Sequence, residues 1–369
     1  MKLFLVDCTR ASSGGSLQHI SSFIDQARKN NQTHIFDIVI SNNIKKRVIS
    51  DIGGINDLNI IWVSNNFLLS SLYLSIIQFR YKSIFILVGP PLWIPLRNSI
   101  TCFAVPHYLY NFSEFCSVYE YAKHPIFKLL FVRTNIFFRK LIHFIFLIPN
   151  NKILVQTEVV KKRLGQNLQF VKDKVFVMPN SLPSLVMNNK VKKIPFKEKS
   201  FFRVLIPSSY YPHKNLDSIS FLSRYKFPFK LKIFFTLRRN QLPKNYNLFK
   251  LKNVEIIFTG QLNLDELSNA YLNTDIVLLP SILECFSSVY QEASFFERPF
   301  ITPDTDFARE VLGDTAYFYD HKQKSSLYNA ILKVKKDFEN NEVKFPKVRK
   351  KYNISPEEKY NLQLSYLLN

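Results

Sequence analysis

The chain has 369 residues, of which 47% are hydrophobic and 21% charged, a composition that excludes a disordered or collagen-like protein. This length is enough for two domains, each with its own core. The formal net charge of +22 calls for an anionic partner, and charge alone does not choose between nucleic acid and lipid. Because no zinc-finger, RNA-binding or helix-turn-helix pattern occurs, we favour an anionic membrane surface and expect no nucleic-acid partner.

The four cysteines, Cys8, Cys102, Cys116 and Cys285, stand far apart, with no C-x-x-C pair and no histidine at metal-ligand spacing. Such spacing favours reduced thiols over a disulfide framework or a zinc site. The opening residues MKLFLVD place an aspartate directly after a short apolar run, unlike a signal peptide. We therefore expect a cytoplasmic protein.

Short apolar runs alternate with helical patterns through the first half of the chain. Residues 2–7 predict a strand and residues 9–16 (TRASSGGS) a loop. A helix follows, with one apolar face formed by Leu17, Ile20, Phe23, Ile24 and Ala27. Further strands are predicted at 35–41, 59–64, 83–89, 101–106, 152–157 and 175–179. The alternation is typical of a doubly wound α/β domain.

The Gly14–Gly15 pair in the first loop has two interpretations. It is either a flexible turn or a backbone that approaches a ligand closely. The G-x-G-x-x-G pattern is absent, so a nicotinamide cofactor is not indicated.

Residues 65–79 form an apolar stretch that ends just before Arg80 and Lys82. At this length we expect the stretch to be buried.

Residues 125–149, PIFKLLFVRTNIFFRKLIHFIFLIP, are apolar but interrupted by basic side chains, which argues against a transmembrane helix. At helical spacing Lys128, Arg133, Arg139 and Lys140 fall on one side with His143. The opposite side carries Phe127, Leu130, Phe131, Phe137, Phe138, Leu141 and Ile145. A basic amphipathic helix of this kind suits an interfacial membrane contact. The alternative is an ordinary core helix with a solvated basic edge.

A polar and basic stretch, residues 184–200, predicts the linker between a domain at 1–183 and a second domain at 201–354. In the second domain strands are predicted at 202–207, 231–237, 254–259, 275–279, 300–303 and 316–319. Ser355-Pro356-Glu357-Glu358 is a helix-start signal for a last helix at 355–369.

The stretch Pro280–Glu297, PSILECFSSVYQEASFFE, follows an apolar strand and carries two carboxylates, Glu284 and Glu292. A strand–loop–helix turn brings both to the carboxyl end of the strand, where open parallel sheets bind ligands. Backbone N–H groups at Ser287 and Ser288, which begin the helix, suit an anion such as a diphosphate. The alternative is a pair of solvated surface carboxylates.

This E-x7-E stretch, with PFITPDTDFAREVLGDTAYFYD after it, resembles the donor-site region of the group 1 (family 4) glycosyltransferases. VLIPSSYYPHKNLDSI (204–219) resembles the first strand and loop of that family's donor domain. KILVQTEVVKKRL and VFVMPNSL resemble the segment that closes its first domain. The resemblance implies an α/β fold of two Rossmann-like domains facing across a cleft (the GT-B type). The last helix could then cross back to the first domain.

The resemblance also implies roles for particular residues. Glu284 binds hydroxyls of the donor sugar, Glu292 the ribose, and Lys214, Ser287 and Ser288 the diphosphate. His107 is a cleft histidine that contacts the donor sugar or orients the acceptor, and Gly15 lies in the Gly-Gly loop. The arginine that usually precedes the lysine is absent, since Ser208 and Ser209 stand there, and Arg238 or Arg239 is the substitute we expect.

The implied chemistry is transfer with retention at the anomeric carbon, with Glu284 and His107 as the catalytic-site residues. We expect no cofactor and no metal. The sequence also contains a D-x-D pattern, Asp304-Thr305-Asp306, which would suggest a metal site. It lies in the loop after the strand 300–303, the wrong position for that role, and Asp306 is better explained as a helix N-cap.

The sequence thus predicts a retaining hexosyltransferase that uses a UDP- or GDP-sugar. The expected acceptor is a lipid-linked saccharide of bacterial surface polysaccharide such as O-antigen, capsule or lipooligosaccharide. The protein would sit peripherally on the inner face of the cell membrane. The alternatives are a nucleotide-sugar epimerase on the same fold, or a basic membrane- or nucleic-acid-binding protein without catalysis.

Overall fold

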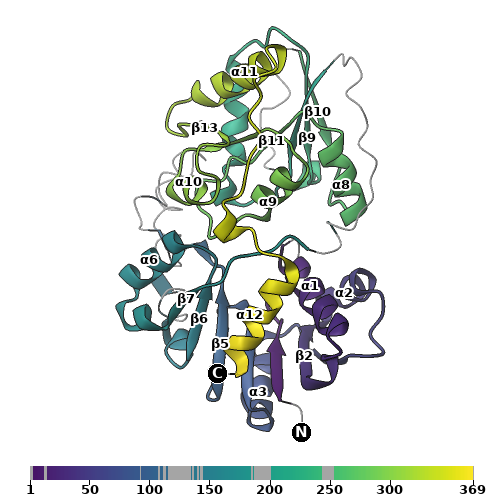
Figure 1. Cartoon of the computed structure of the whole chain (residues 1–369), viewed down its shortest axis with the longest axis vertical. Coiled ribbons are helices and arrows are strands. Elements are labelled where there is room, and N and C mark those ends of the chain that lie inside the picture. The colour runs from purple at the N-terminus through teal and green to yellow at the C-terminus, as the bar shows by residue number, and fades with distance from the viewer. Residues whose placement is uncertain are drawn as a thin grey trace. The chain divides into compact units, whose positions relative to one another are not determined.

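The chain divides into two compact units, which are described one at a time (Figure 1). Unit 1 comprises residues 1–109, 130–184 and 351–369, and unit 2 comprises 110–129 and 185–350. The computed structural model describes residues 3–11, 15–91, 93–106, 109–110, 114, 134, 137–138, 141, 144–183, 186, 201–242 and 253–368. The predicted linker 184–200 lies outside the described residues except for Val186.

Among its described residues, unit 1 contains a seven-stranded parallel sheet in the order β3-β2-β1-β4-β5-β6-β7. Both faces of the central strands are buried, which explains their continuous apolar sequences. All seven predicted strands are present, although β5 begins and ends three residues earlier than expected. The strands are β1 (Phe4–Asp7), β2 (Phe36–Ser41), β3 (Asn59–Val63), β4 (Ser83–Gly89), β5 (Asn98–Phe103), β6 (Lys152–Val155) and β7 (Val175–Val177).

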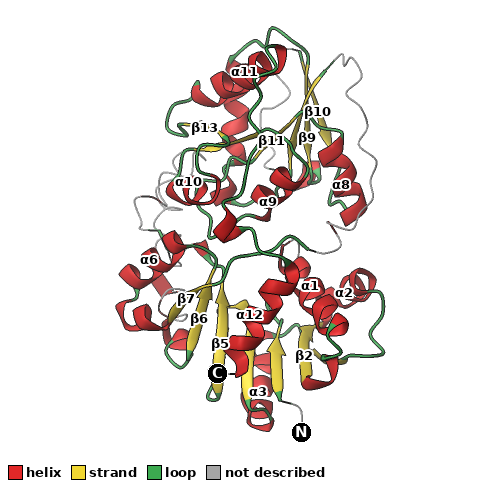
Figure 2. Cartoon of the chain, in the orientation of Figure 1, coloured by secondary structure: helices red, strands yellow, loops and turns green. Residues whose placement is uncertain are grey.

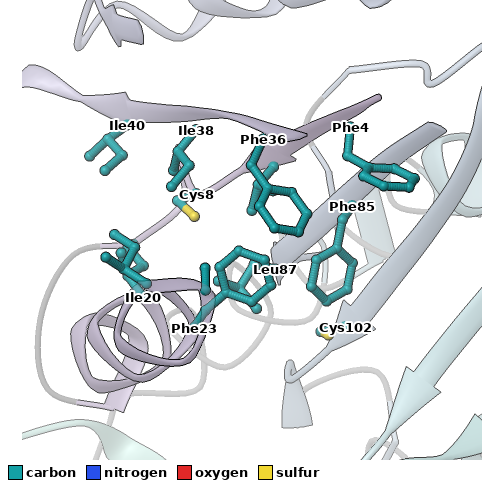
Figure 3. Close-up of a cluster of buried hydrophobic side chains, with 14 of the residues drawn as sticks. Phe4, Cys8, Ile20, Phe23, Phe36, Ile38, Ile40, Phe85, Leu87 and Cys102 are labelled. Atoms are coloured by element: carbon teal, nitrogen blue, oxygen red, sulfur yellow. The ribbon is translucent and has the colours of Figure 1, made fainter. Parts of the chain in front are cut away.

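One face of this sheet packs against α1 (Gly15–Lys29), α2 (Lys45–Ile52) and α12 (Pro356–Leu368). Figure 3 shows the centre of that core, where Phe23 of α1 meets Phe36 and Phe85 of the sheet. The five apolar residues predicted for α1 are all buried, which confirms the periodicity. Residues 351–369 belong to unit 1, and Tyr360 of α12 packs against Phe23. The predicted helix-start signal is also confirmed, because Ser355 and Glu358 exchange capping hydrogen bonds.

The other face packs against α3 (Phe67–Ile77), and here the prediction that residues 65–79 are buried is wrong. Leu74 and Ile77 do enter the core, but Leu68, Leu69, Leu72, Ile76 and Phe79 are exposed. A helix lying on a sheet buries only one stripe, and a second layer is needed to cover the rest. No described residue of unit 1 supplies that layer.

Unit 2 contains, among its described residues, a six-stranded parallel sheet in the order β10-β9-β8-β11-β12-β13. Figure 2 colours the strands yellow and the helices red. All six predicted strands are present, as β8 (Phe202–Ile206), β9 (Leu231–Phe235), β10 (Val254–Phe258), β11 (Ile276–Leu278), β12 (Phe300–Pro303) and β13 (Tyr317–Tyr319). The helices of unit 2 are α8 (Leu264–Leu272), α9 (Ser288–Phe295), α10 (Asp306–Leu312) and α11 (Ser326–Glu339). One further helix, α6 (Glu158–Asn167), belongs to unit 1.

Both sheets place their first strand beside their fourth, so each reverses its winding direction between those two strands. In open parallel sheets that switch point, at the carboxyl ends of the strands, is where ligands bind. In unit 2 it lies between β8 and β11. Within the described ranges no helix has the length and hydropathy needed to cross a bilayer.

Candidate functional site

The loops after β8 and β11 come together at the switch point of unit 2. The backbone N–H of Ile282 donates to the carbonyl of His213 at 3.1 Å, which ties the two loops. Lys214 ends a short 3₁₀ turn (Pro212–Lys214) after β8, and its ammonium group donates a hydrogen bond to the carboxylate of Glu284. Two residues expected at the donor site, 70 positions apart, thus form an ion pair.

This ion pair is largely removed from water. Glu284 is 6% exposed, and the Lys214 side chain is 20% exposed. Burial, and then the negative charge of Glu284, raise the pKa of the Cys285 thiol well above its ordinary value. A desolvated carboxylate and ammonium interact strongly and offer fixed charges to a polar ligand. The pair therefore places a hydrogen-bond acceptor and a cation side by side.

Lys214 is the last residue of its 3₁₀ turn and does not begin a helix. It stands one residue before Asn215, which has a left-handed φ of 50° and precedes the 3₁₀ helix Leu216–Arg224. Its position therefore comes from the tight turn and from Glu284.

Glu292 lies on α9 and is buried, with an exposed fraction of 3%. Its Oε2 accepts a 2.6 Å hydrogen bond from the hydroxyl of Tyr271, on α8. Burial and the Glu292 charge raise the pKa of Tyr271 well above its usual range, so the hydroxyl stays protonated and donates. The Tyr271 ring stacks on Phe296, which fixes the direction of the hydroxyl.

Sequence reasoning missed Tyr271, because its place in the last turn of α8 marks it only as a core residue. It also missed Tyr110, which donates a 2.8 Å hydrogen bond to the Glu284 backbone carbonyl. Tyr110 belongs to unit 2 although it is 174 positions away in sequence, and no pattern in the chain signals that contact.

Ser287 immediately precedes α9, and Ser288 is its first residue. Ser287 is buried, and its side chain makes no capping bond. The N-terminal turn of α9 therefore begins three residues after Cys285, directly beyond the Glu284 loop. A helix N-terminus of this kind favours a bound anion.

Arg238 follows β9, the neighbour of β8, and is exposed. Its side chain runs beside Gly260, where an added Cβ would lie 3.6 Å from Arg238 Cγ. Gly260 has a φ of 74°, a left-handed conformation that favours glycine. Arg238 is thus a cation on the carboxyl edge of the sheet, next to the loop that carries Lys214.

Two other residues predicted for the site do not belong to the described part of unit 2. Gly15 is the first residue of α1, at the carboxyl edge of unit 1, with nothing near the position of an added Cβ. His107 lies outside the described residues.

The D-x-D sequence differs from expectation in one detail. Thr305 precedes α10 and Asp306 is its first residue, so Asp306 is not the N-cap. Asp304 forms a two-point ion pair with Arg309, through bonds of 2.7 and 2.8 Å. Across the described part of the chain, no cluster of three or more His, Cys, Asp or Glu side chains is placed to hold a metal ion.

Comparison with known proteins adds to this geometry. Residues 238–351 match the family of glycosyl transferases group 1. A sequence search of curated proteins finds no match.

Solved structures of glycosyltransferases share the fold over the whole chain. A glycosyltransferase from Rickettsia africae ESF-5 has a TM-score of 0.64 and 17% identity, covering 100% of this chain and 93% of its own. Anabaena Alr3699/HepE in complex with UDP-glucose has a TM-score of 0.64 and 14% identity, with coverages of 98% and 99%. The lipopolysaccharide outer core galactosyltransferase WaaB has a TM-score of 0.59 and 12% identity, with 99% of both chains covered. At these identities the likeness establishes the two-Rossmann (GT-B) fold.

Proposed function

We propose that this protein is a retaining glycosyltransferase, a proposal that rests on the match of residues 238–351 to the group 1 glycosyl transferases. It moves a hexose from a UDP- or GDP-sugar to a saccharide acceptor. The acceptor we propose is lipid-linked and belongs to bacterial surface polysaccharide assembly. UDP-glucose bound to one structural neighbour and the lipopolysaccharide pathway of another support this choice.

The observation that carries the proposal is the Lys214–Glu284 ion pair at the switch point of unit 2. Glu284 accepts hydrogen bonds from the sugar hydroxyls, while Lys214 neutralises the diphosphate. Glu292, oriented by Tyr271, binds the ribose. Opposite charges held in a water-poor site are already arranged for a sugar nucleotide, so little reorganisation is needed when it binds.

Retention requires no covalent sugar–enzyme intermediate in this scheme. The C–O bond to the diphosphate breaks while the acceptor hydroxyl attacks the same face of the anomeric carbon. The acceptor proton passes to the departing diphosphate oxygen. Lys214 and the N-terminal turn of α9 stabilise the negative charge that develops on the leaving group. Arg238 adds a more exposed cation at the same edge. We propose no cofactor and no metal for this step.

We further propose that the protein works on the inner face of the cell membrane. In segment 125–149, Phe137, Phe138, Leu141 and Ile145 are exposed, which favours an interfacial helix over a core helix. The basic residues predicted to meet the lipid headgroups, Lys128, Arg133, Arg139 and Lys140, lie outside the described residues.

Saturation-transfer NMR against a panel of UDP- and GDP-sugars, without added metal, tests the donor site. We expect one nucleotide class to bind the wild type and to be lost in Glu292→Ala. Glu255→Ala, an exposed carboxylate of β10, is the matched control and should bind as the wild type does. Absence of binding by every member of the panel would overturn the proposal. Conversion of the sugar nucleotide without any acceptor would favour the epimerase instead.

A further inference from the structure

The outward side of α3 is an apolar surface that the described residues of unit 1 leave uncovered. Leu68, Leu72 and Ile76 are 72%, 61% and 63% exposed, and Leu69, Tyr73 and Phe79 extend the same surface. Isolated exposed apolar residues are ordinary, but a contiguous set this large marks an interaction site.

A neighbouring loop enlarges this surface and is held rigidly to it. The buried side chain of Gln78 donates to the Ile94 carbonyl at 3.4 Å and accepts from the Leu96 N–H at 2.6 Å. The exposed side chains of Ile94 and Leu96 are thereby fixed next to the end of α3. We call the exposed side chains of residues 68–79 together with Ile94 and Leu96 the α3 surface.

The border of the α3 surface is basic. Arg80, Lys82 and Arg97 are exposed, and the Arg97 guanidinium lies 5.5 Å from the centre of the Phe79 ring. From residue 58 to residue 113 the sequence contains no aspartate or glutamate. An apolar centre with a cationic border is complementary to an anionic lipid surface.

The dimensions suit a helix that lies along a membrane. An 11-residue helix is about 16 Å long, well short of the roughly 30 Å hydrocarbon core of a bilayer. Leu74 and Ile77 hold its inner side against the sheet, so only the outer side can enter the lipid interface.

A second apolar face ends at the same place in unit 1. Phe137, Phe138, Leu141, Ile145 and Ile148 are exposed at the same spacing as Leu68, Leu69, Leu72, Ile76 and Phe79. Just beyond Ile148, the backbone N–H of Asn151 donates to the Ser99 carbonyl at 2.9 Å, at the start of β5. Arg97 of the α3 border directly precedes β5. The two faces therefore meet the sheet at the amino-terminal end of one strand.

We propose that the α3 surface docks unit 1 on an anionic lipid bilayer, with its apolar side chains in the interface and Arg80, Lys82 and Arg97 at the headgroups. The choice of a lipid occupant rests in part on the proposed membrane-side acceptor. A second copy of the chain fits less well, because a two-fold contact through this surface would bring its cationic borders together.

Vesicle flotation with the full-length chain tests the apolar part. Leu72→Gln/Ile76→Gln should lower the partition coefficient on phosphatidylcholine–phosphatidylglycerol vesicles by about tenfold or more. The matched control is Leu362→Gln/Leu368→Gln, on exposed positions of α12 that lie on the opposite face of the same sheet, and it should float like the wild type. Both pairs are exposed, so a retained thermal midpoint is expected in each.

The charge part needs its own variant. Arg80→Gln/Arg97→Gln should weaken binding to vesicles that contain phosphatidylglycerol by about 30-fold, at roughly fivefold per basic residue, and have little effect with phosphatidylcholine alone. Lys46→Gln/Arg47→Gln, on α2 across the sheet, is the control.

Equal flotation of the α3 variants and the wild type would overturn the proposal. So would a wild-type dimer, seen by light scattering, that dissociates in Leu72→Gln/Ile76→Gln. Donor binding measured by NMR in the absence of vesicles should be unchanged in every α3 variant. If the protein floats with vesicles but does not bind the donor, the proposed transferase function is contradicted and the docking surface is supported. If it binds the donor but does not float, the docking surface is contradicted and the transferase function is supported.

Discussion

The carboxyl edges of the two sheets each hold a lysine withdrawn from water, and the two lysines have different partners. Lys214 of unit 2 pairs with a carboxylate, Glu284. Lys359 of unit 1 is 6% exposed and bonds neutral groups, Asn180 Oδ1 at 3.1 Å and His19 Nδ1 at 3.0 Å. The first six strands have the same order in both sheets. The fold alone therefore does not explain why the two lysines have different partners.

The lack of a charged partner affects the protonation of Lys359. Burial lowers the pKa of Lys359 from 10.5 to about 8, with only a small opposing contribution from the Cys102 thiol. Burial and the nearby Lys359 ammonium also lower the pKa of His19 well below its usual value. Among the described residues, Lys359 has no opposite charge beside it and destabilises the fold while it is charged, whereas the Lys214 ammonium faces the Glu284 carboxylate. The comparison teaches that the charge partner, rather than burial, makes Lys214 suitable for binding an anion.

The largest expected effect is at Lys214. Lys214→Met leaves the buried Glu284 unpaired and removes the cation at the leaving group, so we expect kcat/KM for transfer to fall about 100- to 1000-fold. Lys232→Met is the control, since Lys232 pairs with Glu255 at the surface, and kcat/KM should be unchanged. Steady-state kinetics measure both, and equal values for Lys214→Met and the wild type would remove the distinction between the two lysines.

The second-largest expected effect is the change in unfolding free energy with pH that Lys359 causes. Its folded pKa lies below its unfolded value, so the unfolded state binds the proton more tightly and stability rises as pH rises from about 8 toward 10.5. Relative to Lys359→Met, the wild type should gain about 2 kcal/mol of unfolding free energy between pH 7.5 and 10.

Urea unfolding across that pH range measures the difference. The exposed Lys351→Met serves as the control and should run parallel to the wild type. Parallel curves for Lys359→Met as well would mean that the Lys359 ammonium is solvated, and the contrast with Lys214 would then lose its basis.

The smallest effect is at Tyr271, whose hydroxyl orients Glu292. Tyr271→Phe removes a hydrogen bond to a carboxylate, worth about 1.5–3 kcal/mol, and should raise KM for the donor about tenfold with kcat little changed. Tyr317→Phe removes a similar bond to Asp337, 2.9 Å long, between β13 and α11. It should cost comparable stability without altering KM. Equal KM values in both variants would reduce Tyr271 to a core residue.

Much of this molecule followed from local sequence. Strands of a parallel sheet read as short apolar runs, and the thirteen strands found among the described residues were all predicted from such runs. The β11–α9 turn was predicted from its apolar strand and the helix that follows, and Val289, Ala293 and Phe296 are buried at helical spacing. The two carboxylates were identified from their spacing within this turn and from a family resemblance.

Only the tertiary structure decided which side chains meet and which stay uncovered. The Lys214–Glu284 ion pair, the Tyr271 bond to Glu292 and the Tyr110 bond to the Glu284 backbone join residues 21 to 174 positions apart. The α3 stretch is as apolar as a core helix, yet one side of it is exposed. Periodicity reports the local conformation of a segment and its apolar faces. Whether another layer packs on those faces depends on residues far away in the sequence. Those residues come close only when the sheets assemble.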